Sequence, residues 1–313
     1  MNTLAAIVEK DFWVVWTLKH LYELRNGPPF IFKGGTSLSK AFGIIDRFSE
    51  DIDLIIDRGY FGYKGAGDIP SAPTKTAARK RMAQLDDGIA KYIATDLLPI
   101  LQLRFGGILA EPFRLEVDPE NLQTILLYYP TETTHAYIRP MVLIETGGNA
   151  DNWPAVERTI TPYVAQQIPD AFDSAGVVVT TIEAARTFWE KLTILHKTAH
   201  RFDRQPDWEL AARYSRHYYD VYQLSKAGIA SGDFANDGLI DAVRVAAQTF
   251  FADTRAKYEE FAPGSIRLIP GDEGVAALRR DYEAMRDMIF GVYPTFDEII
   301  AELRRIDTIV NRR

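Results

Sequence analysis

The sequence contains no cysteine, which excludes disulfide bonds, thiolate metal sites and a cysteine nucleophile. It has no run of eighteen apolar residues, and its first residues lack the basic and then apolar segments of a signal peptide. We therefore expect a cytoplasmic protein with no membrane partner. The Walker pattern and the Gly-x-Ser-x-Gly and His-Glu-x-x-His motifs are also absent, which disfavours P-loop NTPases and leaves those hydrolase classes unmatched.

An excess of basic residues is also lacking, since the 313-residue chain has a formal net charge of −7. This balance argues against a protein that coats nucleic acid along its whole surface. Basic residues are nevertheless concentrated in residues 186–216 and in the short segment Lys75 to Arg81. Local clusters of this kind suit a triphosphate or the backbone of one RNA end. The alternative for either cluster is a solvated helix face.

The pattern of apolar residues predicts an α/β (α+β) fold, with a modest sheet in residues 1–175 and a mostly helical part in residues 176–313. Helices are expected over 4–26, 36–44, 75–96, 182–201, 208–226, 234–260, 275–290 and 295–310. Strands are expected over 30–32, 51–56, 101–105, 114–117, 124–129, 139–145 and 177–179.

Two carboxylates on a buried strand are the most informative feature of the sequence. Asp51 and Asp53 are two residues apart, so on a strand they point to the same face. Their neighbours Ile52, Leu54 and Ile55 are apolar, which predicts a buried strand on which the two charges need a cation. Hard oxygen ligands favour Mg²⁺ bridging to phosphates. We therefore predict that Asp51 and Asp53 are metal ligands.

A glycine-rich turn precedes this strand in the segment Lys33-Gly34-Gly35-Thr36-Ser37. Glycine lets the backbone approach a phosphate closely, and the hydroxyl residues stand at the start of the predicted helix 36–44. The sequence therefore predicts that this segment binds nucleotide phosphates, and that the chain transfers a group from a nucleoside triphosphate.

A third carboxylate is often supplied by a neighbouring strand in two-metal transferases. Glu145 is the preferred candidate because it ends an apolar strand just before Gly147. Glu116 and Asp118 are the competitors, and they could instead belong to the edge of a hairpin.

The glycine turn followed by Asp-x-Asp resembles the DNA polymerase β-like nucleotidyltransferase superfamily. The segments KGGTSLSK and RFSEDIDL look like the AbiEii/AbiGii family of toxin nucleotidyltransferases. This resemblance implies a nucleotidyltransferase catalytic domain in residues 1–175 and a helical domain that contributes to the active site and to acceptor binding. It also implies an NTP substrate, Mg²⁺ or Mn²⁺, a cognate antitoxin encoded nearby, and an RNA acceptor such as the tRNA 3′ end.

The resemblance extends to the helical part of the chain. Lys191 matches a family lysine that contacts the triphosphate, and Asp220 matches an aspartate that orients or completes the site. Arg216 corresponds, less closely, to a family arginine at the nucleotide. Arg213, Arg216, His217 and Asp220 are spaced to share one face of a predicted helix, so a structural ion-pair cluster is the alternative.

Two other functions are compatible with the same motifs. One is a nucleotidyltransferase that modifies a small molecule, because the motifs recognise only the triphosphate and metals. The other is a nucleotide-binding module without catalytic activity.

Overall fold

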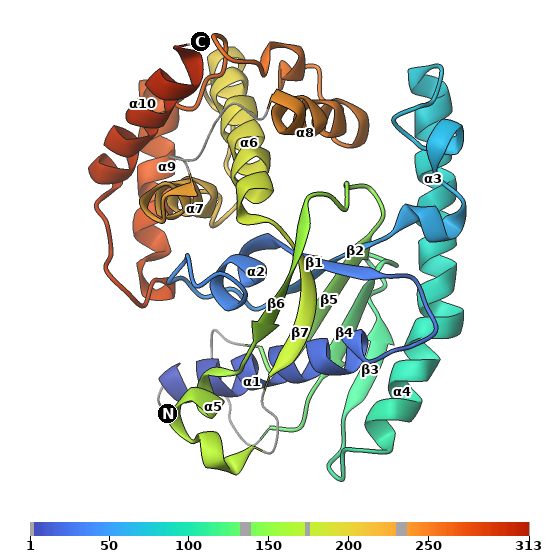
Figure 1. Cartoon of the computed structure of the whole chain (residues 1–313). Coiled ribbons are helices and arrows are strands. Elements are labelled where there is room, and N and C mark those ends of the chain that lie inside the picture. The colour runs from blue at the N-terminus through green and yellow to red at the C-terminus, as the bar shows by residue number, and fades with distance from the viewer. Residues whose placement is uncertain (1–2, 132–138, 173–175, 230–236, 313) are drawn as a thin grey trace. The chain divides into compact units, whose positions relative to one another are not determined.

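The computed structural model describes residues 3–131, 139–172, 176–229 and 237–312 (Figure 1). Its residues group into two compact units, each described by itself below. The first unit comprises residues 1–41 and 49–182, and the second comprises residues 42–48 and 183–313. No helix of the described segments is long and apolar enough to cross a membrane. The division near residue 175 stays a prediction about domains.

The first unit is built on a mixed sheet that has seven strands among the described residues, in the order β3-β4-β5-β2-β1-β7-β6. The strands are β1 (Phe30–Lys33), β2 (Ile52–Ile56), β3 (Arg114–Val117), β4 (Thr124–Tyr128), β5 (Met141–Gly147), β6 (Ala155–Ile160) and β7 (Val177–Ile182). The pairs β2–β5 and β1–β7 are parallel, and the other neighbouring pairs are antiparallel. The predicted α/β (α+β) class is confirmed.

Strand β2 has the composition of a strand covered on both faces. Ile52, Leu54, Ile55 and Ile56 are at most 2% exposed, and Asp53 is the one half-buried residue among them. Near-continuous apolar runs are typical of such central strands. The polar Asp53 is therefore held in a rigid, apolar setting.

Helices cover this sheet and extend from it. They are α1 (Thr3–Tyr22), α2 (Gly34–Lys40), α3 (Lys75–Tyr92), α4 (Leu98–Gly106) and α5 (Tyr163–Gln167). Helix α1 packs against β7 and β5, and a π-helical turn, η3 (Ile93–Leu97), joins α3 to α4. Three short 3₁₀ turns are η1 (Arg58–Phe61), η2 (Gly65–Gly67) and η4 (Pro169–Ala171).

The strand expected over residues 101–105 is wrong, because these residues belong to α4. The alternation of apolar and polar residues suggested a strand, but Leu103 is 81% exposed while Leu101 and Phe105 are fully buried. Residues four apart share one helix face, so the helical period decides which side chains are buried. The expected elements also omit β6, an edge strand with mostly exposed residues.

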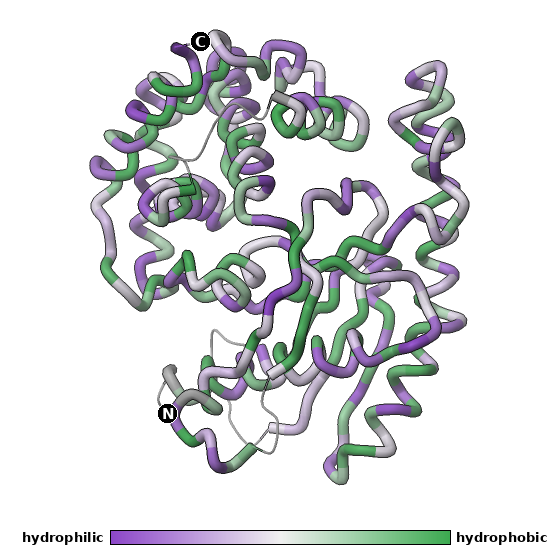
Figure 2. The backbone as a smooth tube through the Cα atoms, viewed as in Figure 1, coloured by the Kyte–Doolittle hydropathy of each residue, from purple (hydrophilic) through white to green (hydrophobic). Residues whose placement is uncertain are grey.

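The second unit is helical, as expected. Its elements are α6 (Ala184–Arg204), α7 (Arg216–Lys226), α8 (Asp237–Phe250), η6 (Tyr258–Glu260), α9 (Asp272–Ala284), η7 (Arg286–Met288) and α10 (Phe296–Asn311). Helix α6 contacts α7, α8 and α9, while α10 packs against α7. Figure 2 shows hydrophobic and hydrophilic residues interspersed along these helices, which is typical of helices that bury one face.

The two largest differences between the expected and the observed helix bounds are at α7 and α8. Helix α7 begins at Arg216, not near 208, because Arg213 has a left-handed backbone with φ of 64° and its N–H donates to Asp281. Helix α8 ends at Phe250, ten residues before the expected end. The first expected residues of that helix, 234–236, lie outside the described residues.

Candidate active site

A row of polar residues crosses the sheet of the first unit. Asp53 on β2 is in register with Lys33 on β1 and with Glu145 on β5, and Glu145 is in turn opposite Thr124 on β4. Residues opposite each other on neighbouring strands point to the same face. Asp51 lies two residues before Asp53, so the three predicted carboxylates converge on one side of the sheet.

The three carboxylates interact electrostatically. Burial raises the pKa of Glu145 to about 7, with further contributions from the charges of Asp53 and Asp51 and from a hydrogen bond shared with Asp53. The nearby Lys33 ammonium acts in the opposite direction. This unfavourable concentration of negative charge is stabilised by a cation or by a proton.

Glu145 is better placed than its competitors. Glu116 lies on β3 and accepts a hydrogen bond from Arg114 at 2.7 Å, while Asp118 accepts one from the backbone N–H of Glu120 at 2.9 Å. Strand β3 is separated from β2 by β4 and β5. At about 4.8 Å per strand, β3 lies roughly 14 Å from β2. Glu145 alone of the three lies directly opposite Asp53.

The donor set fits a divalent cation because it offers carboxylate oxygens on adjacent strands, the ligands that Mg²⁺ and Mn²⁺ prefer. In the side-chain conformations described, no group of three His, Asp or Glu residues forms a complete ligand cluster. Asp51, Asp53 and Glu145 are the residues that would hold such a cation.

The glycine turn lies directly against the carboxylates. Gly34 has a φ of +78°, and a Cβ atom built on it would lie 2.0 Å from Oδ2 of Asp53. Only glycine combines this backbone conformation with so close an approach. Gly35 follows in the first turn of α2. The turn thus sets the position of the Asp53 carboxylate, a role that the sequence did not reveal.

The two hydroxyl residues of the turn are buried and bonded to the protein. Thr36 donates to the Ser49 hydroxyl at 2.9 Å, and Ser37 donates to the carbonyl of Gly34 at 2.9 Å. Thr36 therefore links α2 to the segment that leads into Asp51. Glu50, the residue next to Asp51, forms an ion pair with the buried Lys10 of α1.

A separate charge cluster lies in the second unit around Asp220 of α7. This fully buried carboxylate accepts two hydrogen bonds from Arg47, at 2.7 and 2.8 Å, and pairs with Lys191 of α6 at 2.7 Å. Burial alone would raise the pKa of Asp220, but the charges of Arg47 and then Lys191 hold it well below its ordinary value. The cluster therefore combines two cations with one carboxylate.

Arg47 is the member of this cluster that the sequence did not identify. It is 173 positions from Asp220, and no sequence spacing links the two residues. Arg216, which the resemblance had suggested, is exposed at the start of α7. Arg213 lies outside the helix, so the predicted shared face retains Arg216, His217 and Asp220 only.

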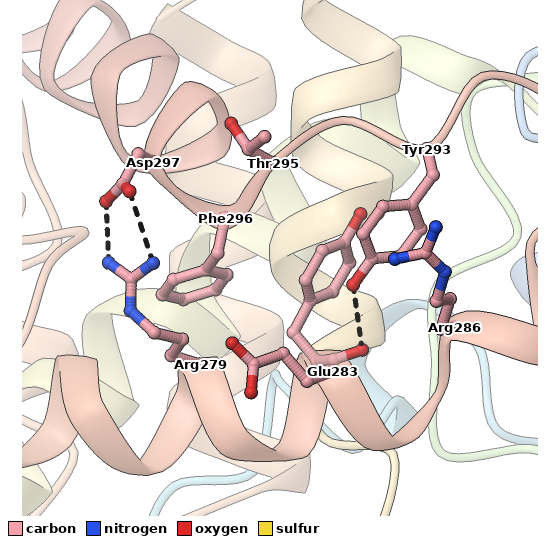
Figure 3. A pocket seen from close by; sticks show the side chains of 8 residues that line it. Arg279, Glu283, Arg286, Tyr293, Thr295, Phe296 and Asp297 are labelled. Carbon is pink, nitrogen blue, oxygen red and sulfur yellow. Dashed lines mark hydrogen bonds and ion pairs between the residues drawn. The ribbon is translucent and has the colours of Figure 1, made fainter.

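A pocket of about 380 Å³ in the second unit lies between α9 and α10 (Figure 3). The Tyr282 and Tyr293 rings that line the pocket are stacked, with their centroids 4.8 Å apart, and the Arg286 guanidinium lies 5.0 Å from the centroid of the Tyr293 ring. Arg279 pairs with Asp297 at 2.6 Å. These contacts use both faces of Tyr293, so the cluster is explained by packing.

Comparison with known proteins identifies the family of the chain. A family model described as "Nucleotidyl transferase AbiEii toxin, Type IV TA system" matches residues 16–303. No curated protein matches the chain in sequence. Among solved structures, the chain is similar to MenT4, a nucleotidyltransferase toxin from Mycobacterium tuberculosis H37Rv. The identity is 15%, the TM-score is 0.42, and the match covers 98% of this chain and 92% of that one.

A TM-score of this size carries no argument by itself, so the assignment depends on the family match. That match includes the glycine turn, the three carboxylates, and both Lys191 and Asp220. The chain belongs to the AbiEii family of nucleotidyltransferase toxins of type IV toxin–antitoxin systems.

Proposed function

We propose that this nucleotidyltransferase transfers a nucleoside monophosphate from an NTP to the 3′ end of an RNA, such as a tRNA, and thereby blocks translation. The acceptor hydroxyl attacks the α-phosphate, a new phosphodiester bond forms, and pyrophosphate leaves. The observation that carries the proposal is the convergence of Asp53 and Glu145, in register on β2 and β5, with the Gly34 backbone against Asp53.

Asp51, Asp53 and Glu145 would hold Mg²⁺ or Mn²⁺. When bound, the metal ions stabilise the charge that develops on the attacking and leaving oxygens. Glu145, which lies opposite Asp53 on the neighbouring strand, would also help to accept the proton of the acceptor hydroxyl.

The nucleotide would be held by the glycine turn and by basic residues. The backbone of Gly34 and Gly35 faces the triphosphate, Lys33 lies beside the carboxylates, and Thr36 and Ser37 keep the turn in place through their hydrogen bonds. As the family resemblance implies, Lys191 contacts the triphosphate and Arg216 assists it. Asp220 fixes the orientation of Lys191, which it contacts at 2.7 Å.

The type IV family assignment implies a cognate antitoxin. We propose that it is encoded nearby and that the toxin acts in the cytoplasm. A reading frame for a small DNA-binding protein beside this gene would support this part of the proposal.

The test is transfer of label from each of the four [α-³²P]NTPs, first to total RNA and then to small hydroxyl compounds. Asp53→Asn should reduce transfer by about 10³-fold or more, because a metal ligand is lost. The matched control is Asp87→Asn, which changes an exposed carboxylate of the same unit. EDTA should stop transfer, and Mg²⁺ or Mn²⁺ should restore it.

Three results would refute parts of the proposal. If Asp53→Asn keeps half of the wild-type transfer rate, Asp53 is not an active-site residue. Label on small compounds but not on RNA would indicate a small-molecule acceptor. Growth inhibition that persists in Asp53→Asn would indicate a nucleotide-binding module that acts without catalysis.

A further inference from the structure

The first half of α3 carries a concentration of positive charge in an otherwise acidic chain. Between Asp68 and Asp86 there are four Lys or Arg residues and no carboxylate. Lys75, Arg79 and Lys80 are exposed. We call residues 74–84 the basic arm, and Figure 1 shows these first turns of α3 lying beyond the edge of the sheet.

The charges of the basic arm are not used by the fold. Within the described residues, Lys75, Arg79 and Lys80 form no ion pair, whereas the Arg81 guanidinium donates to the backbone carbonyls of Ala66 and Asp68. A lysine in the first turn of a helix also opposes the helix dipole, so Lys75 does not favour the helix itself. The three exposed cations are therefore available to an external anion.

The basic arm is held on a rigid base. The Thr74 hydroxyl caps the helix by accepting from Ala77 N–H, and Arg81 fixes the preceding loop to the helix. Arg58 in turn binds Asp68 and Asp151. The exposed cations thus have a defined position on the first unit, which reduces the entropy lost when they bind.

The other half of α3 connects the basic arm to the carboxylate row. Leu85 is fully buried against Gly148, and Asp86 accepts hydrogen bonds from Gln123 and Asn149 at 3.0 and 2.7 Å. Gly148 follows Glu145 by three residues, which is about 10 Å along an extended chain. Lys75 precedes Asp86 by eleven residues, or about 16 Å along the helix. The basic arm and the carboxylate row are therefore separate surfaces of the same unit.

The surface of the basic arm suits a phosphate backbone better than a protein. The large exposed hydrophobic residues nearest in sequence are Tyr60 and Ile100, and none of those described lies between them. Protein interfaces depend on buried aromatic or aliphatic anchors, whereas RNA backbones are bound by Lys and Arg with little apolar contact.

We propose that the basic arm is the docking surface for the phosphate backbone of the acceptor RNA, upstream of the 3′ end that receives the nucleotide. Lys75, Arg79 and Lys80 neutralise successive phosphates, and Arg81 positions the arm. The inference deepens the proposed function, on which it rests, by assigning acceptor binding to a surface separate from the carboxylates.

The test is fluorescence anisotropy with a 5′-labelled tRNA transcript, in EDTA and without NTP, so that binding is measured apart from transfer. The test protein carries Lys75→Gln, Arg79→Gln and Lys80→Gln. The matched control carries Arg25→Gln, Arg280→Gln and Arg304→Gln, which remove the same charge from exposed positions. Melting temperatures should be unchanged, because none of the six side chains forms an ion pair in the described structure.

The test protein should bind RNA at least tenfold more weakly at 50 mM salt, and the slope of log K against log salt should become shallower by about two to three. The control should change affinity by less than twofold. In transfer assays the test protein should show a raised KM for RNA, with kcat and the KM for NTP unchanged.

Equal weakening in the test and control proteins would overturn the proposal, because general electrostatics would then explain binding. Unchanged RNA binding in the test protein would overturn it too and leave an acidic protein as the partner of the basic arm. Asp53→Asn separates the two proposals, since it should bind RNA normally but not transfer. If the test protein binds RNA more weakly but neither it nor the wild-type protein transfers label to RNA, the docking surface is upheld and the proposed function is refuted.

Discussion

Gly34→Ala tests whether the glycine turn sets the position of the Asp53 carboxylate. The new methyl group would lie 2.0 Å from Asp53 Oδ2, about 1 Å inside the 3.0 Å limit of real Cβ contacts. Asp53 must therefore move by about that distance. Displacement of a reacting group by 1 Å typically costs about 10²-fold in rate. We expect transfer by Gly34→Ala to fall by about 10²-fold or more.

The loss of stability should be modest and can be matched by a control. An alanine in the left-handed region costs about 1–2 kcal/mol, and Gly34 has a φ of +78°. Gly62 of the same unit has a φ of +90°, and a Cβ added to it would meet no heavy atom within 4 Å, so Gly62→Ala introduces the backbone strain without the clash. Both variants should lose about 1–2 kcal/mol of unfolding free energy, but only Gly34→Ala should lose activity.

Urea unfolding gives the stability of each variant, and label transfer from [α-³²P]NTP to RNA gives the rate. If Gly34→Ala keeps more than half of the wild-type rate, the described contact between the turn and Asp53 does not govern catalysis. If Gly62→Ala loses as much activity as Gly34→Ala, backbone strain alone explains the effect.

Three further predictions concern buried charges. Asp220→Asn should lower the unfolding free energy by about 3–5 kcal/mol, because it leaves two buried cations without a carboxylate. Lys191→Ala leaves Asp220 paired with Arg47 and should lower it by about 1–3 kcal/mol. Equal losses of unfolding free energy in urea would contradict this order. Glu145→Gln should raise the melting temperature at pH 8 in EDTA. Burial and then the two neighbouring carboxylates raise the pKa of Glu145 to about 7, so its charged form at pH 8 destabilises the folded protein. A lower melting temperature would refute this reasoning. Burial lowers the pKa of His196 to about 4. The stability that His196 contributes is therefore complete above the unfolded pKa of about 6.5, and up to about 3 kcal/mol of it is lost as pH falls to 4. His196→Gln should flatten the dependence of unfolding free energy on pH, and an unchanged slope would exclude His196 as its source.

The sequence alone was sufficient for the local features of the carboxylate strand. Asp51 and Asp53 stand two apart in a run of apolar β-formers, and the strand period of two places them on one face without further information. The same holds for the helical second unit, because the apolar residues of α6 and α10 repeat at the helical period. These features depend on neighbours in the chain, which the sequence displays directly.

The local sequence pattern gave a wrong prediction where tertiary contacts decide between the strand period and the helical period. Residues 101–105 alternate like a strand, yet the continuation from α3 through η3 makes them helical and leaves Leu103 in solvent. The edge strand β6 has mostly exposed residues and no strong apolar signal, so its pairing with β7 defines it. Packing energy outweighed the weak local preference in both cases.

Long-range pairing decided the rest of the candidate site. Register across the sheet brings Glu145 opposite Asp53, although the two lie far apart in sequence, whereas Asp118 follows β3, which β4 and β5 separate from β2. Likewise, only the tertiary structure places Arg47 against Asp220 and presses the Gly34 backbone onto the Asp53 carboxylate. Sequence patterns specify which side chains share a face of one element, but the pairing of distant elements follows from the burial of all those faces together.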